Sequence, residues 1–164
     1  MSNRTHELVA AFERANQTII EALEQCSEEQ LRAVCPGEGW PVVVAAHHVA
    51  LAYQPIAGMV SNIAKGEPLP PFTPEMLDQA NAEHAREFAN VSRDETVALL
   101  RREAKAAADS VRDLTDEQLG RTAVVTLAGG QTFSAEAMLE GALVGHALDH
   151  GKSIQQVVLQ GAAA

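Results

Sequence analysis

The sequence is poor in aromatic residues, cysteine and positive charge, and each shortage excludes a class of protein. Phe, Trp and Tyr make up 4% of the chain, whereas Ala, Leu, Glu and Gln are abundant, a composition that favours helix over sheet. Only Cys26 and Cys35 are present, and without a secretion signal we expect two free thiols rather than a disulfide framework. The net charge of −10 argues against a surface that binds nucleic-acid phosphates.

The chain also lacks a long uninterrupted apolar run. The longest one, Pro41 to Tyr53, contains His47 and His48 and is shorter than the roughly 20 residues that a membrane-spanning helix needs. The first residues, Met1 to Glu7, have no apolar signal core. We therefore expect a cytoplasmic protein that binds neither membranes nor nucleic acid. The length of 164 residues suits a single domain over residues 1–164.

Apolar residues recur at helical spacing in four long segments, which predicts an all-α protein. The predicted helices cover 4–25, 42–65, 74–114 and 135–160, and the third is either one long helix or two collinear pieces. Short extra helices are expected after Ser27 and Thr115, which begin similar capping sequences. Gly129-Gly130 lies between β-prone residues and indicates a small β-hairpin before the last helix. A four-helix bundle is the natural way to bury four apolar stripes.

The clearest chemical signal is a pair of histidines, His146 and His150, in the last predicted helix. Residues four apart lie on one face of a helix, so two imidazoles at this spacing can bind one metal ion. The same face carries Leu139, Leu143 and Ile154, which predicts that the pair points toward the core. No His-Glu-x-x-His sequence is present, so the zinc-protease motif is absent.

A metal site of this kind needs at least a third ligand from another helix. The candidates are His47 and His48 in the most apolar predicted helix, and because neighbouring helical residues lie about 100° apart, only one of them can face the pair. Periodicity alone leaves this choice open. We expect His6 and His84 to be exposed. The alternative is that the histidines are hydrogen-bonded core residues without a metal.

One stretch resembles a known family. Gly39-Trp40-Pro41-Val42-Val43-Val44-Ala45-Ala46-His47-His48-Val49 is similar to the Gly-Trp-…-His motif of the DinB/YfiT-like metalloenzyme superfamily, which is related to mycothiol-dependent maleylpyruvate isomerase-like proteins. His146-x-x-x-His150 matches the second motif of that family. The resemblance implies a DinB-like four-helix bundle and selects His48, which follows the tryptophan by eight residues, as the third ligand. The predicted metal ligands are therefore His48, His146 and His150.

The resemblance suggests a role for one further residue, Asn81, the position of Asp149 beside a ligand histidine suggests another, and the sequence departs from the family at Pro41. Asn81 resembles a recurrent asparagine that would line the pocket, with an exposed helical Asn as the alternative. Asp149 could orient a ligand histidine, with a solvated charge as the alternative. Pro41 replaces the more usual Ser or Thr after the tryptophan, which is a mild change at a helix start.

Three neutral imidazoles leave the charge of a divalent metal uncompensated, and that charge lowers the pKa of a bound water or thiol. The ligand set suits zinc, nickel, iron or cobalt, of which we expect zinc or nickel. Thiol-dependent branches of the family use a low-molecular-weight thiol. The resemblance thus implies a metal-dependent S-transferase or isomerase acting on a small-molecule substrate, with a hydrolase as a variant and a homodimer as the expected assembly. The alternative is a non-catalytic metal- or small-molecule-binding stress-response bundle. Catalytic residues are not identified by the sequence.

Overall fold

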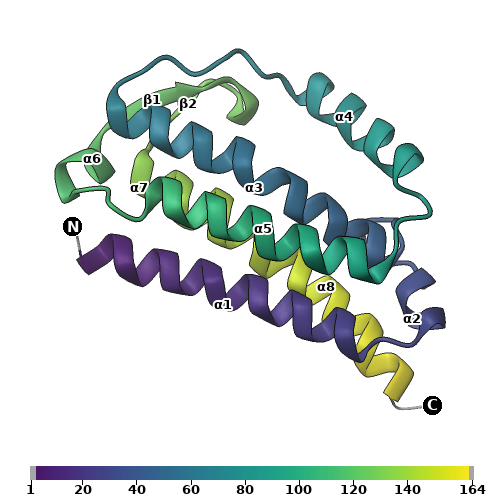
Figure 1. Cartoon of the computed structure of the whole chain (residues 1–164). Coiled ribbons are helices and arrows are strands. Elements are labelled where there is room, and N and C mark those ends of the chain that lie inside the picture. The colour runs from purple at the N-terminus through teal and green to yellow at the C-terminus, as the bar shows by residue number, and fades with distance from the viewer. Residues whose placement is uncertain (1–2, 163–164) are drawn as a thin grey trace.

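Four long helical units run side by side in the computed structural model, which describes residues 3–162 (Figure 1). They are α1 (Asn3–Gln25), α3 (Val42–Lys65), α5 (Arg93–Val111) and α8 (Gly145–Ala162). A short helix, α7 (Ala135–Met138), leads into α8 through a π-helical turn, η2 (Leu139–Val144). The predicted all-α four-helix bundle is confirmed.

The predicted segment 74–114 is two helices that are not collinear. The first, α4 (Pro74–Glu87), lies outside the bundle beside α3, and the chain turns before α5 begins (Figure 1). Ser92 ends that turn with a capping box, in which its hydroxyl accepts from the Glu95 N–H and the Glu95 carboxylate accepts from the Ser92 N–H. The cap therefore overrides the apolar periodicity that runs on across both helices.

The smaller elements agree with the sequence patterns. The helices α2 (Glu28–Arg32) and α6 (Asp116–Gly120) each begin with a capping box, at Ser27 and Thr115. The strands β1 (Thr122–Val125) and β2 (Gln131–Ser134) form the expected antiparallel hairpin, with Val125 paired to Gln131. Between them lie the 3₁₀ turn η1 (Thr126–Ala128) and two glycines at positive φ, 67° and 78°, which only glycine adopts readily.

The long helices form two parallel pairs. Ser61 and Gln54 on α3 each hydrogen-bond to the carbonyl 49 residues further on in α5, and this constant offset means that α3 and α5 run in the same direction. The extended segment after α3 and helix α4 make this possible, because they return the chain to the end of the bundle where α3 began (Figure 1). α3 packs on α5 and α8, and α1 packs on the same two helices from the opposite side.

α3 is the central helix of the bundle. Its first five residues, Val42 to Ala46, are at most 1% exposed, as expected from a segment that is apolar all round. By length and hydropathy alone it is the one helix among residues 3–162 that could cross a membrane. More than half of its most apolar window is buried in the protein, which is the environment of a core helix.

Candidate metal centre

Three histidines from two helices converge at the α3–α8 interface. His48 comes from α3, and His146 and His150 come from successive turns of α8. Each offers one ring nitrogen such that the three nitrogens lie within 4.8 Å of one another. The ring centroids of His146 and His150 are 4.4 Å apart, and both rings lie 5.2–5.3 Å from the ring of His48. The structure thus brings together the three residues predicted as ligands.

His47 does not join this cluster. Its Nδ1 lies 2.9 Å from Nε2 of His84 on α4, within hydrogen-bonding distance, and its ring packs on Phe88. The two adjacent histidines of α3 therefore face different neighbours, as the 100° turn between helical residues requires. The prediction that His84 is exposed was wrong, because its side chain is 8% exposed and buried against α3. His6 is exposed, as predicted.

Glu38 is part of the site and was missed by the sequence analysis. Its Oε1 lies 2.9 Å from Nδ1 of His150, and both side chains are more than four-fifths buried. Glu38 lies in a tight loop between Gly37 and Gly39, both at positive φ, and the loop is closed by the hydrogen bond from the Cys35 N–H to the Trp40 carbonyl. A carboxylate that accepts from Nδ1–H fixes the ring and leaves Nε2 as the free ligand atom.

Burial keeps His48 and His146 neutral. Loss of solvation, together with the neighbouring rings of His146 and His150, lowers the pKa of His48 to about 3. Burial likewise lowers the pKa of His146 to about 4, with His150 contributing. Both rings are therefore uncharged at neutral pH, which is the protonation state that binds metal ions.

Two buried atoms of the site, Nε2 of His146 and Oε2 of Glu38, have an unmet bonding capacity among the described residues. Nε2 of His146 is buried and has no hydrogen-bond partner among the described residues. An unpartnered buried polar atom costs free energy, and native proteins rarely leave one without a partner, an ion or a function. Three imidazole nitrogens and a supporting carboxylate match the donor set of a divalent zinc-type site. The residues present fit a divalent metal ion.

Asp149, Cys26 and Cys35 are not among the described side chains that could share one metal ion. Asp149 is exposed and lies 3.5 Å from Lys152, so the solvated charge is the correct alternative for it. Asn81 is half-buried on α4. Cys26 and Cys35 are buried free thiols, as predicted, and burial raises the pKa of Cys35 to about 12, which makes it a poor nucleophile.

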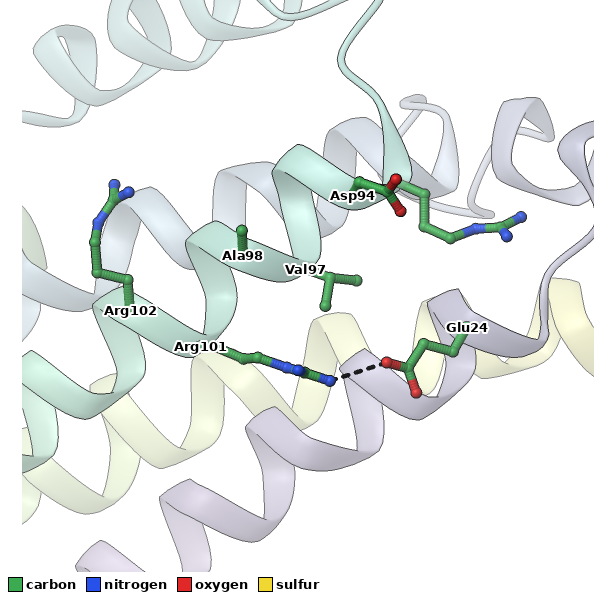
Figure 2. Close-up of a pocket in the computed structure, with 7 residues that line it drawn as sticks. Glu24, Asp94, Val97, Ala98, Arg101 and Arg102 are labelled. Atoms are coloured by element: carbon green, nitrogen blue, oxygen red, sulfur yellow. Dashed lines mark hydrogen bonds and ion pairs between the residues drawn. The ribbon is translucent and has the colours of Figure 1, made fainter.

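A second candidate location is an open groove of about 550 Å³ between α1 and α5 (Figure 2). An ion pair of 2.9 Å between Glu24 and Arg101 crosses it, and no histidine lines it. Its walls are charged side chains that are largely exposed. The groove is lined by Glu24, Arg93, Asp94, Val97, Ala98, Arg101 and Arg102. It has none of the convergent buried groups of the histidine cluster.

Fold and cluster together define a four-helix bundle with a three-histidine centre between two of its helices. The family model of the DinB superfamily matches residues 11–154, and the chain belongs to the DinB superfamily. No curated protein sequence matches the chain.

Solved structures with the same fold are distant in sequence. One is YfiT from Bacillus subtilis, described as a probable metal-dependent hydrolase with an unusual four-helix bundle topology. It is 18% identical, with a TM-score of 0.80 over 99% of this chain and 90% of that chain. Another is mycothiol-dependent maleylpyruvate isomerase, 16% identical, with a TM-score of 0.72 over 98% of this chain and 70% of that chain. At these identities the likeness shows the fold.

Proposed function

We propose that the protein is a divalent-metal-dependent enzyme whose metal ligands are His48, His146 and His150. The observation that carries the proposal is the convergence of three ring nitrogens within 4.8 Å, one of them a buried nitrogen without a hydrogen-bond partner. Zinc or nickel suits the three imidazoles. Three protein ligands leave a coordination position free, as in catalytic rather than structural zinc sites.

The chain's own residues would prepare this site in separate ways. Glu38 holds His150 through its Nδ1 and fixes the tautomer that presents Nε2. Burial keeps His48 and His146 neutral, so that no proton competes for their nitrogens near pH 7. A divalent ion bound here would supply a positive charge that lowers the pKa of a thiol or water beside it.

For the reaction, we favour transfer or isomerisation that consumes a low-molecular-weight thiol and a small electrophilic substrate. The chain provides no suitable thiol of its own, because Cys26 and Cys35 are buried and their pKa values are raised. Maleylpyruvate isomerase of the same fold is described as mycothiol-dependent. Hydrolysis is the second candidate, since YfiT is described as a probable metal-dependent hydrolase. A non-catalytic metal-binding bundle is the alternative to both.

The metal assignment is tested by elemental analysis of protein purified without a histidine tag. We expect about one equivalent of metal in the natural chain, loss of it in His146→Ala, and full retention in His6→Ala, which removes an exposed histidine. Full metal content in His146→Ala would contradict the ligand assignment.

The reaction class is tested on the metal-loaded protein. Thiols of several kinds are mixed with electrophilic acceptors, and esters and amides are tested separately without thiol. Thiol consumption that requires metal supports the transferase, and turnover without thiol supports the hydrolase. Metal binding without either activity favours the non-catalytic alternative. We further propose that the protein is cytoplasmic and forms a homodimer. Light scattering of the purified chain would test the dimer.

A further inference from the structure

Helix α4 is attached to the bundle mainly through one polar residue. His84 is the only residue of Pro74–Glu87 that is buried, and the helix makes its main contacts with α3. On both sides α4 is joined by segments without helix or strand, residues 67–73 and 88–92, and it lies outside the four main helices (Figure 1). A helix with so little buried surface depends on the few contacts that it makes.

Those contacts lie against the metal-ligand helix. Nε2 of His84 is 2.9 Å from Nδ1 of His47, and Phe88 packs on both rings, with centroids 4.2 Å from His47 and 5.1 Å from His84. The His84 ring also meets the ring of His48 edge-on, with centroids 5.5 Å apart. His84 therefore contacts both its hydrogen-bond partner, His47, and the proposed metal ligand, His48.

His48 is held differently from His150. Glu38 fixes His150 by a hydrogen bond, whereas His48 has four rings around it. Two of those rings belong to the other ligands. The remaining two, Trp40 and His84, have centroids 5.0 and 5.5 Å away and leave His48 little freedom to rotate. Since His48 is the only ligand from α3, the metal site is complete only when this ring stays turned toward α8.

We propose that His84 is a positioning residue for the metal ligand His48, and that docking of α4 through the His47–His84 contact and metal binding stabilise each other. The inference rests on the proposed metal site. When α4 is docked, His84 closes one side of the His48 ring; when α4 is displaced, that ring can turn away from His146 and His150. Coupling of this kind is reciprocal, so a metal ion that favours the ordered His48 also favours docked α4.

The first test measures Co²⁺ affinity and the visible absorption spectrum of the bound ion in variants at position 84. His84→Ala removes both the ring and the hydrogen bond, and we expect Kd to rise about tenfold, the lower end of what outer partners of metal ligands contribute. His84→Phe keeps a ring against His48 and is expected to recover part of the affinity and the natural spectrum. Wild-type Kd and spectrum in His84→Ala would overturn the proposal.

Two controls separate positioning from general stability. Leu119→Ala removes a core side chain in α6, and should lower the melting temperature without changing Kd or the cobalt spectrum. His6→Phe repeats the histidine-to-phenylalanine change at an exposed position. If Leu119→Ala weakens Co²⁺ binding as much as His84→Ala does, the role of His84 is only structural and the proposal fails.

The second test measures hydrogen exchange of α4 with and without Zn²⁺. We expect bound zinc to slow amide exchange in residues 74–87 severalfold in the natural chain and to have little effect on them in His84→Ala. Equal exchange of α4 with and without zinc overturns the coupling, provided that the natural chain binds zinc. If the natural chain binds no metal at all, it is the proposed function that fails, so the two failures are distinguishable.

Discussion

Two interfaces of the bundle join antiparallel helices through polar side chains, and they do so in opposite ways. Between α1 and α5, the carboxylates of Glu13 and Glu24 lie 2.9 Å from Arg112 and Arg101, at exposed positions. Between α3 and α8, the polar groups are three mostly buried histidines, and burial keeps His48 and His146 neutral. These two pairs of the first interface match opposite charges, whereas the second interface keeps a buried nitrogen, Nε2 of His146, without a hydrogen-bond partner among the described residues.

The comparison distinguishes polar groups that stabilise an interface from polar groups that are available to bind a ligand. An exposed ion pair gains little free energy, but leaves nothing unsatisfied. A buried histidine cluster costs desolvation and is retained in a stable fold only when its bonding capacity is used. Charge points to the arginine-lined groove of Figure 2, whereas the convergence of three histidine nitrogens within 4.8 Å points to the α3–α8 interface.

The largest expected effect comes from removing a ligand at the α3–α8 interface. His146→Ala leaves two imidazoles, and the Kd for zinc should rise more than about 100-fold, beyond the range of outer partners. Competition against a chromophoric chelator measures it. The matched change at the other interface, Glu24→Ala, should leave the zinc Kd unchanged, and weaker binding in that variant would break the comparison.

Glu38→Gln should have the next largest effect. The amide keeps the size of the side chain but loses the negative charge that accepts from Nδ1–H of His150, so the zinc Kd should rise about 10- to 100-fold. Glu28→Gln, which removes a carboxylate paired with Arg93 between α2 and α5, is the control. Equal affinities in Glu38→Gln and the natural chain would show that the 2.9 Å contact does not support the ligand.

The metal-free protein should lose stability when the pH falls below about 6.5. Burial lowers the pKa of His48 to about 3 and of His146 to about 4 in the folded state, so the unfolded chain binds more protons between these values and 6.5. The free energy of unfolding is therefore unaffected by these two histidines above pH 6.5. Below that pH it falls by up to about 1.4 kcal/mol per pH unit for each histidine.

Urea unfolding of chelator-treated protein between pH 7.5 and pH 5 measures this slope. The His146→Gln variant should show a shallower slope, because one titrating ring is gone, while His6→Gln should keep it. A free energy of unfolding that is flat over this range would mean that the cluster is not desolvated as the structure shows.

The smallest effect is expected at the α1–α5 interface. Glu24→Gln breaks an ion pair whose side chains are 50% and 61% exposed, and the free energy of unfolding should fall by no more than about 1 kcal/mol. Chemical denaturation in low and high salt checks this, since salt should remove most of the difference. A loss of several kcal/mol would mean that this interface also carries strongly coupled charges.

Helices with a regular apolar stripe were predictable from the sequence. Phe12 and Ile19 of α1 recur at helical spacing and are fully buried, and the glycine pair 129–130 marked the hairpin. The division of 74–114 was not settled, because the stripe continues across it while the Ser92 cap interrupts the helix. Spacing expresses local preference, and whether α4 is collinear with α5 depends on how α4 packs on α3.

The site was predictable in part, for a related reason. His146 and His150 follow from i, i+4 spacing on one apolar face, but the choice of His48 over His47 needed family resemblance. Glu38 lies in a turn, where no periodicity marks a residue as inward-facing. His84 was placed wrongly because α4 is polar overall, and only its contact with α3 buries that one ring.

The order of the ligands along the chain also determines when the metal centre can form. Glu38 and His150 are in contact but lie 112 residues apart in the sequence. His48 is on α3, whereas the other two proposed ligands are on the last helix. During synthesis, Glu38 and His48 are therefore made long before the two histidines that complete the cluster. A metal ion can be bound by all three histidines only when the last helix lies against α3. Full metal uptake therefore reports that the final helix is in place.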